Sequence, residues 1–335
     1  MMHGGPDAAG VPLHDFSTNS NACGPCPTAL AALQAADATH YPDPHYTHLR
    51  AALADFHGVS PQRVLLAASA SEAISRLSAW VALQGAQRGV WLPSHHYGDY
   101  ARVARVWGLQ SVADPAQAAL LWACEPSSPL GQAHADLAAQ VRALHGGQHL
   151  VLDCAYAPLR LSGQPSLEAA QRDHVWQLCT PNKALGLTGV RAAYVLAPLG
   201  AEAEVALLTA LAPSWPLGTH GVALLQSWIT PATQTWLAHS LRTLTDWKAR
   251  QRALCQSLGW AVQPSCANYF VAQPQGDVPQ LLAHLRAAHG IKLRDAASFG
   301  LPGQVRLGVL PPAAQDALAA AVAAVTTTTS LKVSG

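Results

Sequence analysis

Charge is scarce in this chain: charged residues make up 12% of its 335 residues, and the formal net charge is +1. Because lysine and arginine form no runs, the sequence has no electrostatic footprint for nucleic acid or an anionic membrane. No apolar run approaches the roughly 20 residues that cross a bilayer, and residues 1–5 lack the basic start and apolar core of a signal peptide. We therefore expect a cytoplasmic protein that acts on a small-molecule substrate.

Cysteines are few, odd in number and scattered, which argues against a disulfide framework. Cys23 and Cys26 form a C-x-x-C before an apolar segment, residues 29–36, that we expect to be helical, the setting of a thioredoxin-like motif. Such a motif needs a buried strand directly before the first cysteine, whereas residues 16–21 are polar and turn-forming. A thiol-redox site is the less favoured interpretation and stays open.

Half of the residues are hydrophobic, enough for a sizeable core. Short apolar runs alternate with segments whose apolar residues recur at three and four, which is helical spacing. This alternation predicts an α/β fold with a mostly parallel sheet covered by helices on both faces. The expected strands are residues 64–66, 90–92, 118–122, 150–152, 175–178 and 192–196.

The pattern changes after Pro216 to a long helical region over about 221–258, interrupted near Pro231. Shorter strands and helices follow, which predicts a separate small α+β domain. We expect an N-terminal arm and part of the small domain at 1–40, and a large domain at 41–230. A linking helix and the small domain would occupy 231–325, and a flexible tail 326–335.

Lysine is rare, with four in the chain, and Lys183 lies among small uncharged residues between two expected strands. A pocket lysine of this kind can form an imine with an aldehyde, although the alternative is a surface lysine on a loop. Arg191 follows eight residues later, with Gly186 and Gly189 between them. Its guanidinium could clamp a phosphate through two hydrogen bonds.

Asp153 ends an expected buried strand, where open α/β sheets place their ligands. A buried carboxylate needs a partner, and a pyridinium N–H would be one. Tyr156 could then donate its hydroxyl to the phenolate oxygen of the same ring. The alternative for Asp153 is a helix N-cap.

Ser69, Ala70 and Ser71 follow an expected strand and open a helix, where free amides can bind an anion. Such starts are also ordinary capping signals. Tyr97, after another expected strand, could stack on a cofactor ring or belong to the core.

In this order the features resemble those of the class I/II aminotransferases of pyridoxal-phosphate (PLP) fold type I. The resemblance implies PLP as the cofactor, held by Lys183 as a Schiff base, with Asp153 on the pyridine nitrogen and Tyr156 on the phenolate. It implies Tyr97 as the stacking ring and a homodimer in which Tyr41 reaches the neighbour's phosphate. The implied phosphate cup is Ser69, Ala70, Ser71, Thr180 and Arg191.

Two departures from that family's pattern concern the cofactor site. Where the family has an asparagine that bonds the phenolate oxygen, this chain has Ser128, whose shorter side chain loses that bond or needs a water. The expected phosphate loop also lacks the glycines common in relatives.

The ends of the chain resemble the L-threonine-O-3-phosphate decarboxylases of cobalamin biosynthesis, whose nearest relatives are histidinol-phosphate aminotransferases. The matching segments are 3–5, 14–21, 214–218, 293–295 and 303–308. This resemblance implies that Arg306 grips the substrate carboxylate, and that Arg294 serves the carboxylate or the substrate's phosphate. His3 and Asn19 would complete the pocket, and Cys23 to Cys26 would occupy a turn without a redox role.

The resemblance implies decarboxylation of L-threonine O-3-phosphate to (R)-1-aminopropan-2-yl phosphate. Transamination of the histidinol-phosphate type is the alternative, because the same residues serve both reactions and no motif reports which bond breaks. A PLP-fold protein that binds a ligand without turnover is the alternative of another class. We expect no metal site.

Overall fold

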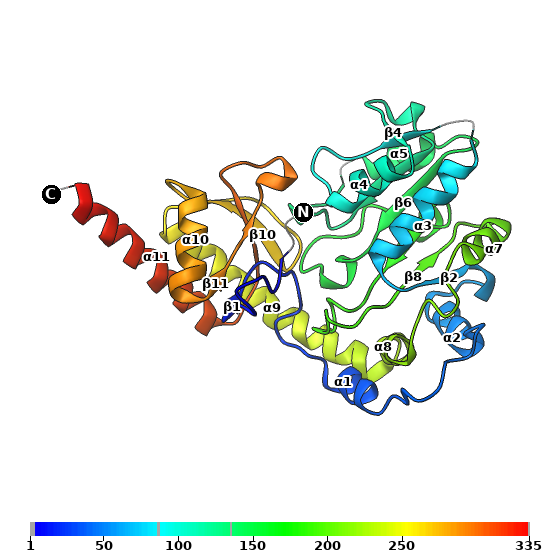
Figure 1. Cartoon of the computed structure of the whole chain (residues 1–335), viewed down its shortest axis with the longest axis horizontal. Coiled ribbons are helices and arrows are strands. Elements are labelled where there is room, and N and C mark those ends of the chain that lie inside the picture. Colours follow the sequence, from blue (N-terminus) through cyan, green and yellow to red (C-terminus); the bar gives the residue numbers. More distant parts are fainter. Residues whose placement is uncertain (1–3, 86–87, 135, 334–335) are drawn as a thin grey trace.

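The computed structural model describes residues 4–85, 88–134 and 136–333, with side chains to residue 324. Figure 1 shows two lobes joined by one long helix, α9 (Pro231–Ser257). The larger lobe is built on a sheet in the order β2-β8-β7-β6-β5-β3-β4. These strands are β2 (Val64–Ala67), β3 (Gly89–Trp91), β4 (Gln110–Ser111), β5 (Leu120–Cys124), β6 (His149–Asp153), β7 (Trp176–Cys179) and β8 (Ala193–Leu196).

The sheet is parallel except at β8, which runs antiparallel to both β2 and β7. Helices on one face bury apolar side chains against β2, β3 and β5, and those on the other face cover β5, β6 and β8. The first group comprises α3 (Ala70–Leu83), α4 (Gly98–Val106) and α7 (Glu202–Ala210). The second comprises α2 (Thr47–His57), α5 (Leu137–Ala143) and α8 (Thr219–Trp228). The α/β prediction with helices on both faces is confirmed.

The smaller lobe has an antiparallel sheet in the order β12-β13-β10-β9 with α10 (Val278–His289) and α11 (Pro312–Val333). Its strands are β9 (Ala261–Val262), β10 (Tyr269–Gln273), β12 (Arg294–Asp295) and β13 (Val305–Gly308). The start of the chain joins this lobe, because β1 (His14–Asp15) pairs with β11 (Ile291–Lys292). The remaining elements are α1 (Pro27–Gln34), α6 (Ala169–Arg172), η1 (Pro61–Arg63), η2 (Pro115–Gln117), η3 (Ala157–Leu159) and η4 (Ala297–Phe299).

The expected strands of the large sheet match β2, β3, β5, β6, β7 and β8, with small shifts at their ends. The expected helical region after Pro216 is divided into α8 and α9 by residues 229–230. Residues 326–333, expected as a flexible tail, continue α11, since no glycine or proline interrupts the helix there. Among the described helices, none combines the length and the apolarity of a membrane span.

Candidate active site

A cavity of about 390 Å³ lies at the carboxyl edge of the large sheet and is closed by side chains of the small lobe. Cys124 and Asp153 end β5 and β6, and Thr180 follows β7, so three parallel strands deliver residues to one place. The cavity brings together most of the predicted site residues. These are Asn19, Ser69, Ala70, Ser71, Tyr97, Ser128, Asp153, Tyr156, Thr180, Lys183, Arg191, Arg294 and Arg306.

Two predicted residues are not placed there. Tyr41 is 79% exposed and its ring stacks on Trp215 with centroids 4.5 Å apart, away from the cavity lining. A residue that serves a neighbouring subunit's site would face outward in one chain. His3 lies outside the described residues.

Asp153 is 5% exposed and its carboxylate has two donors. Tyr100 donates its hydroxyl to Oδ2 at 2.5 Å, and the Ala155 amide donates to Oδ1 at 2.9 Å. Burial raises the pKa of this carboxyl, while Tyr100, Ala155 and the Lys183 ammonium oppose the rise. A cationic N–H at this carboxylate would offset the cost of its burial.

Lys183 follows β7 in a turn and lies beside Tyr156, with Nζ 5.4 Å from the ring centroid. Among the described side chains, none forms a hydrogen bond or ion pair with this ammonium. The turn is held by backbone contact with the start of the chain: Asn21 donates its amide to the Lys183 carbonyl at 2.9 Å. Lys183 is thus fixed at its backbone while its amine stays available.

The rigid turn around Lys183 depends on two glycines. Gly186 has φ +68°, and a Cβ there would lie 2.9 Å from Cα of Gly24. A Cβ on Gly24 would likewise lie 2.9 Å from Cα of Gly186. The Cys23 to Cys26 turn therefore packs backbone to backbone against the lysine turn.

This packing bears on the thiol-redox interpretation. Cys26 is fully buried with Sγ 4.0 Å from Oγ1 of Thr233, and Cys23 directs Sγ at the Ser240 carbonyl, 3.8 Å away. Both contacts are with α9, and neither cysteine lines the cavity. The geometry favours a packing role.

An anion cradle lines the same cavity. Ser69 caps α3 by accepting the Glu72 amide at 3.1 Å. The other amides of the first helical turn have no acceptor within the helix and can bind an anion. Thr180 donates its hydroxyl to the Ala192 carbonyl at 3.1 Å, and Arg191 lies on the exposed side of the cavity. A helix start, a hydroxyl and a guanidinium together suit a phosphate.

Tyr97 also lines the cavity. Burial raises its pKa to about 12, so its hydroxyl stays protonated at neutral pH. Ser128, the residue at the position of the family's asparagine, is buried and lines the same cavity.

Two buried arginines of the small lobe complete the cavity. Arg294 and Arg306 are directly opposite each other on β12 and β13. Arg294 donates to Oγ of Ser298 at 2.8 Å, and Arg306 donates to the Ser17 carbonyl at 3.0 Å. Burial first, and then Arg306, lowers the pKa of Arg294. No carboxylate among the described residues pairs with either guanidinium, so both are placed to receive an anionic ligand.

The N-terminal arm forms one wall of the cavity through Gly4, Ser17, Thr18 and Asn19. Asn19 is 2% exposed, and neither its amide oxygen nor its nitrogen has a partner among the described residues. A buried amide without partners is costly unless a ligand satisfies it.

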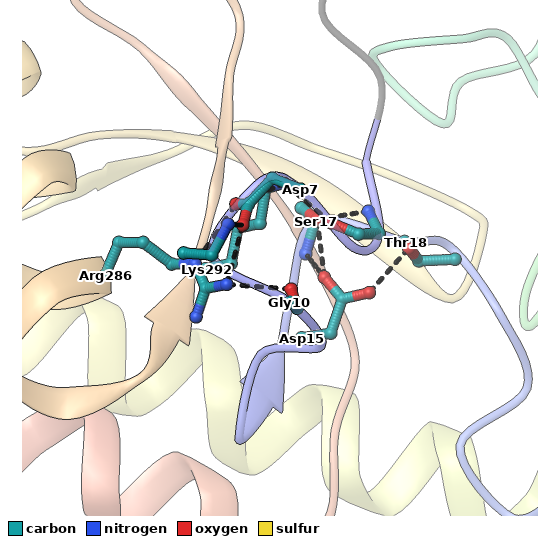
Figure 2. Close-up of polar contacts among 9 residues, drawn as sticks. Asp7, Gly10, Asp15, Ser17, Thr18, Arg286 and Lys292 are labelled. Carbon is teal, nitrogen blue, oxygen red and sulfur yellow. Dashed lines mark hydrogen bonds and ion pairs between the residues drawn. The ribbon is translucent and has the colours of Figure 1, made fainter.

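Ion pairs fix this arm to the small lobe, as Figure 2 shows. The Asp7 carboxylate pairs with Arg286 of α10 at 2.7 Å and with Lys292 of β11 at 2.9 Å. These cations hold the pKa of Asp7 far below its usual range. Lys292 also donates to the Gly5 carbonyl at 2.6 Å. We call Asp7, Arg286 and Lys292 the arm clasp.

Sequence reasoning missed Tyr100, the fully buried donor to Asp153. Its signal was its position three residues after Tyr97, and the two rings pack edge to face with centroids 5.8 Å apart. Asn182, Ser298 and Phe299 also line the cavity without a distinctive sequence signal.

The fold and the cavity together define an enzyme of PLP fold type I. The residues fit the cofactor: a lysine amine and a buried carboxylate, each without an ion pair among the described residues, meet an anion cradle in one cavity. PLP is the cofactor of this enzyme.

Comparison with known proteins identifies the family. The model of the aminotransferase class I and II family matches residues 12–113 and 108–324, so the chain belongs to this family. A histidinol-phosphate aminotransferase of Ruegeria pomeroyi is 28% identical, over 88% of this chain and 86% of that protein.

Two solved structures share the fold. Histidinol-phosphate aminotransferase from Sinorhizobium meliloti, in complex with pyridoxal-5'-phosphate, has a TM-score of 0.81 at 22% identity and covers 96% of this chain and 94% of its own. L-threonine-O-3-phosphate decarboxylase from Porphyromonas gingivalis has a TM-score of 0.73 at 20% identity and covers 89% and 92%. Membership of the family favours an enzyme over a binding protein without turnover.

Proposed function

We propose that this enzyme transfers an amino group to or from a small phosphorylated substrate, in the manner of the histidinol-phosphate aminotransferases it resembles. The pair of buried arginines, Arg294 and Arg306, faces the cavity of Lys183 without a carboxylate partner among the described residues and supports an anionic substrate for either reaction. The observation that carries transamination is the match of the aminotransferase class I and II model over most of the chain. The relatives matched over most of the chain support transamination.

When bound, PLP supplies an aldehyde for the substrate amine and a ring that takes up the electron pair from Cα. Lys183 would hold the cofactor through its Nζ, and the same amine would move the proton at the substrate Cα. Asp153, held by Tyr100, would keep the ring nitrogen protonated, and Tyr156 would donate to the phenolate oxygen. The cup of Ser69, Ala70, Ser71, Thr180 and Arg191 would hold the phosphate.

A specific observation favours a second candidate, decarboxylation of L-threonine O-3-phosphate. Two adjacent arginines suit a substrate with both a carboxylate and a phosphate, whereas histidinol phosphate carries only the phosphate. In this reaction Arg306 and Arg294 would bind the two anions, with Asn19 bonding the substrate between them. Lys183 would return a proton to Cα after CO₂ leaves.

We further propose a homodimer in which the face of Tyr41 and Trp215 meets a second copy. The exposed stacked pair is the observation that supports it, since large exposed aromatics favour interfaces. Our proposed division of the chain is a large domain at 41–230 and a small domain at 231–325 completed by residues 1–40.

The first experiment tests the cofactor chemistry. We expect purified protein with PLP to absorb near roughly 410–430 nm, and borohydride to fix the cofactor mass on the peptide that carries Lys183. Lys183→Ala should lose both signals, while Arg250→Gln, on the exposed side of α9, should keep them. A band that survives Lys183→Ala would contradict the role of this lysine.

The second experiment separates the reactions. Histidinol phosphate with 2-oxoglutarate should yield glutamate, whereas threonine phosphate should release CO₂ only if the second candidate is right. Arg306→Gln and Arg294→Gln should each raise KM for the preferred substrate by about tenfold or more, because each removes charged hydrogen bonds. CO₂ release without glutamate would replace transamination by decarboxylation.

A further inference from the structure

A second hollow, of about 400 Å³, lies where the two lobes meet the long helix and shares no lining residue with the active-site cavity. Three segments line it: the stretch after η3, one side of α9, and the segment before β10. The polar residues among them are Ser162, Thr245, Lys248, Arg252 and Ser265. The hollow thus touches both lobes and their link.

Two cations of this hollow have no counterion among the described residues. Lys248 is 7% exposed, and its ammonium donates to the Ser265 carbonyl at 2.6 Å. Arg252, one helical turn later, donates to the Gln263 carbonyl at 2.9 Å. Like charges at this spacing repel, and a buried charge is costly unless it is paired.

Two other charged groups of this region are already paired. Arg250, on the opposite side of α9, pairs with Asp316 at 2.6 Å. The buried Glu125 carboxylate accepts from Arg160 and from the Ser166 amide. Burial first, and then Arg252, lowers the pKa of Lys248 to about 8, as expected for a cation without an anion beside it.

The arrangement suits an oxyanion. Lys248 and Arg252 project from one side of α9 because they are four residues apart, and Thr245 and Ala249 share that side. Lys248 keeps one N–H donor beyond the two given to the carbonyl and hydroxyl of Ser265, and Arg252 keeps guanidinium N–H groups beyond the one given to Gln263. Ser162 adds an exposed hydroxyl from the large lobe.

We propose that Lys248, Arg252 and Ser162 form a binding site for a phosphate-class oxyanion, separate from the substrate cavity. An anion held there contacts both the linking helix and the large lobe, and it neutralises the two cations next to the segment before β10. Its binding therefore stabilises this placement of the lobes.

The test uses PLP-loaded enzyme reduced with borohydride, so that the cofactor stays in place and its phosphate cup is filled. Inorganic phosphate is titrated while the thermal midpoint is followed, with chloride at equal ionic strength as the reference. We expect phosphate to raise the midpoint, and Arg252→Gln and Lys248→Gln each to weaken phosphate binding by about tenfold or more. Glycerol phosphate in a second arm tests whether a phosphomonoester binds as well as free phosphate.

Two control variants keep the result specific. Arg242→Gln, an exposed position on the same helix, should leave the phosphate response unchanged. Arg306→Gln removes an anion-binding group of the substrate cavity and should keep the part of the response that Arg252→Gln loses. An unchanged response in Arg252→Gln would overturn the proposal, even if Lys248→Gln failed to fold. So would a response lost in Arg306→Gln alone, since phosphate would then bind the active site. The readout is independent of activity, so failure of the proposed reaction would not affect it.

Discussion

Tyr100 is the residue whose contact most directly sets the chemistry of the site. Its ring is fully buried, stacked on Trp122 with centroids 4.5 Å apart, and its hydroxyl meets Asp153 at 2.5 Å. The tyrosine therefore orients the Asp153 carboxylate, and its hydrogen bond offsets part of the free-energy cost of burying that charge.

We expect Tyr100→Phe to lower kcat/KM by about tenfold, because a buried charged acceptor loses one donor. The pKa of Asp153, already raised by burial, should rise further, so the acidic limb of the pH-rate profile should move to higher pH. The profile of kcat/KM against pH for both proteins measures this.

Tyr194→Phe is the matched control. Tyr194 is also buried and its hydroxyl bonds His57 at 2.8 Å, outside the cavity, so this variant should keep the wild-type profile. An acidic limb that stays in place in Tyr100→Phe would show that Asp153 does not depend on this donor.

At the scale of single residues, the sequence predicted most of the residues that line the cavity, but not the residues with which they form hydrogen bonds and ion pairs. Lys183, Asp153 and Arg191 stood out because charge is rare in the chain and these positions flank apolar strands. Tyr100 resembled any core aromatic, since a hydrogen bond between β6 and α4 depends on how the helix lies on the sheet. The arm clasp was missed because Asp7 lies 279 residues from Arg286 along the chain.

Among the elements, α3 is capped by Ser69, a residue that we propose also binds the cofactor phosphate. Ser69 accepts the Glu72 amide at 3.1 Å and also lines the cavity. We expect Ser69→Ala to lower the free energy of unfolding by about 1 kcal/mol and to weaken PLP binding as well. Urea unfolding of the apoprotein and PLP titration measure the two effects separately.

Thr230 offers the comparison, because it caps α9 by accepting the Thr233 amide at 3.3 Å and lies outside the cavity. Thr230→Ala should lose a similar stability and keep PLP affinity. Equal PLP affinity in Ser69→Ala and the wild type would remove Ser69 from the phosphate cup.

The buried strands were the elements best predicted from sequence, since β5 and β6 are apolar on both faces. The direction of β8 was not predictable, because an apolar run reads alike in either direction. The segment 326–333 shows the reverse problem: four threonines suggested a frayed tail, yet they extend α11.

At the scale of the whole molecule, the arm clasp connects the start of the chain to the small lobe. Because Gly4 and Ser17 to Asn19 line the cavity, loosening the clasp should affect substrate binding more than turnover. We expect Asp7→Asn to raise KM several-fold with kcat nearly unchanged, measured by steady-state kinetics with the preferred substrate.

Asp316→Asn breaks a comparable exposed ion pair, with Arg250, far along the chain from the arm. It should leave both constants unchanged. A fall in kcat without a change in KM in Asp7→Asn would show that the arm acts on the reacting groups rather than on substrate binding.

The helix α9 is 27 residues long, which at 1.5 Å per residue gives a rod of about 40 Å. One end packs against α1 and α8 below the large sheet, and the other against β9 and α11. A tilt of α9 by about a tenth of a radian at the large lobe would move its far end by about 4 Å. Arg294 and Arg306 belong to the small lobe, so a tilt of this kind would also move their guanidinium groups relative to the residues that the large lobe contributes to the cavity.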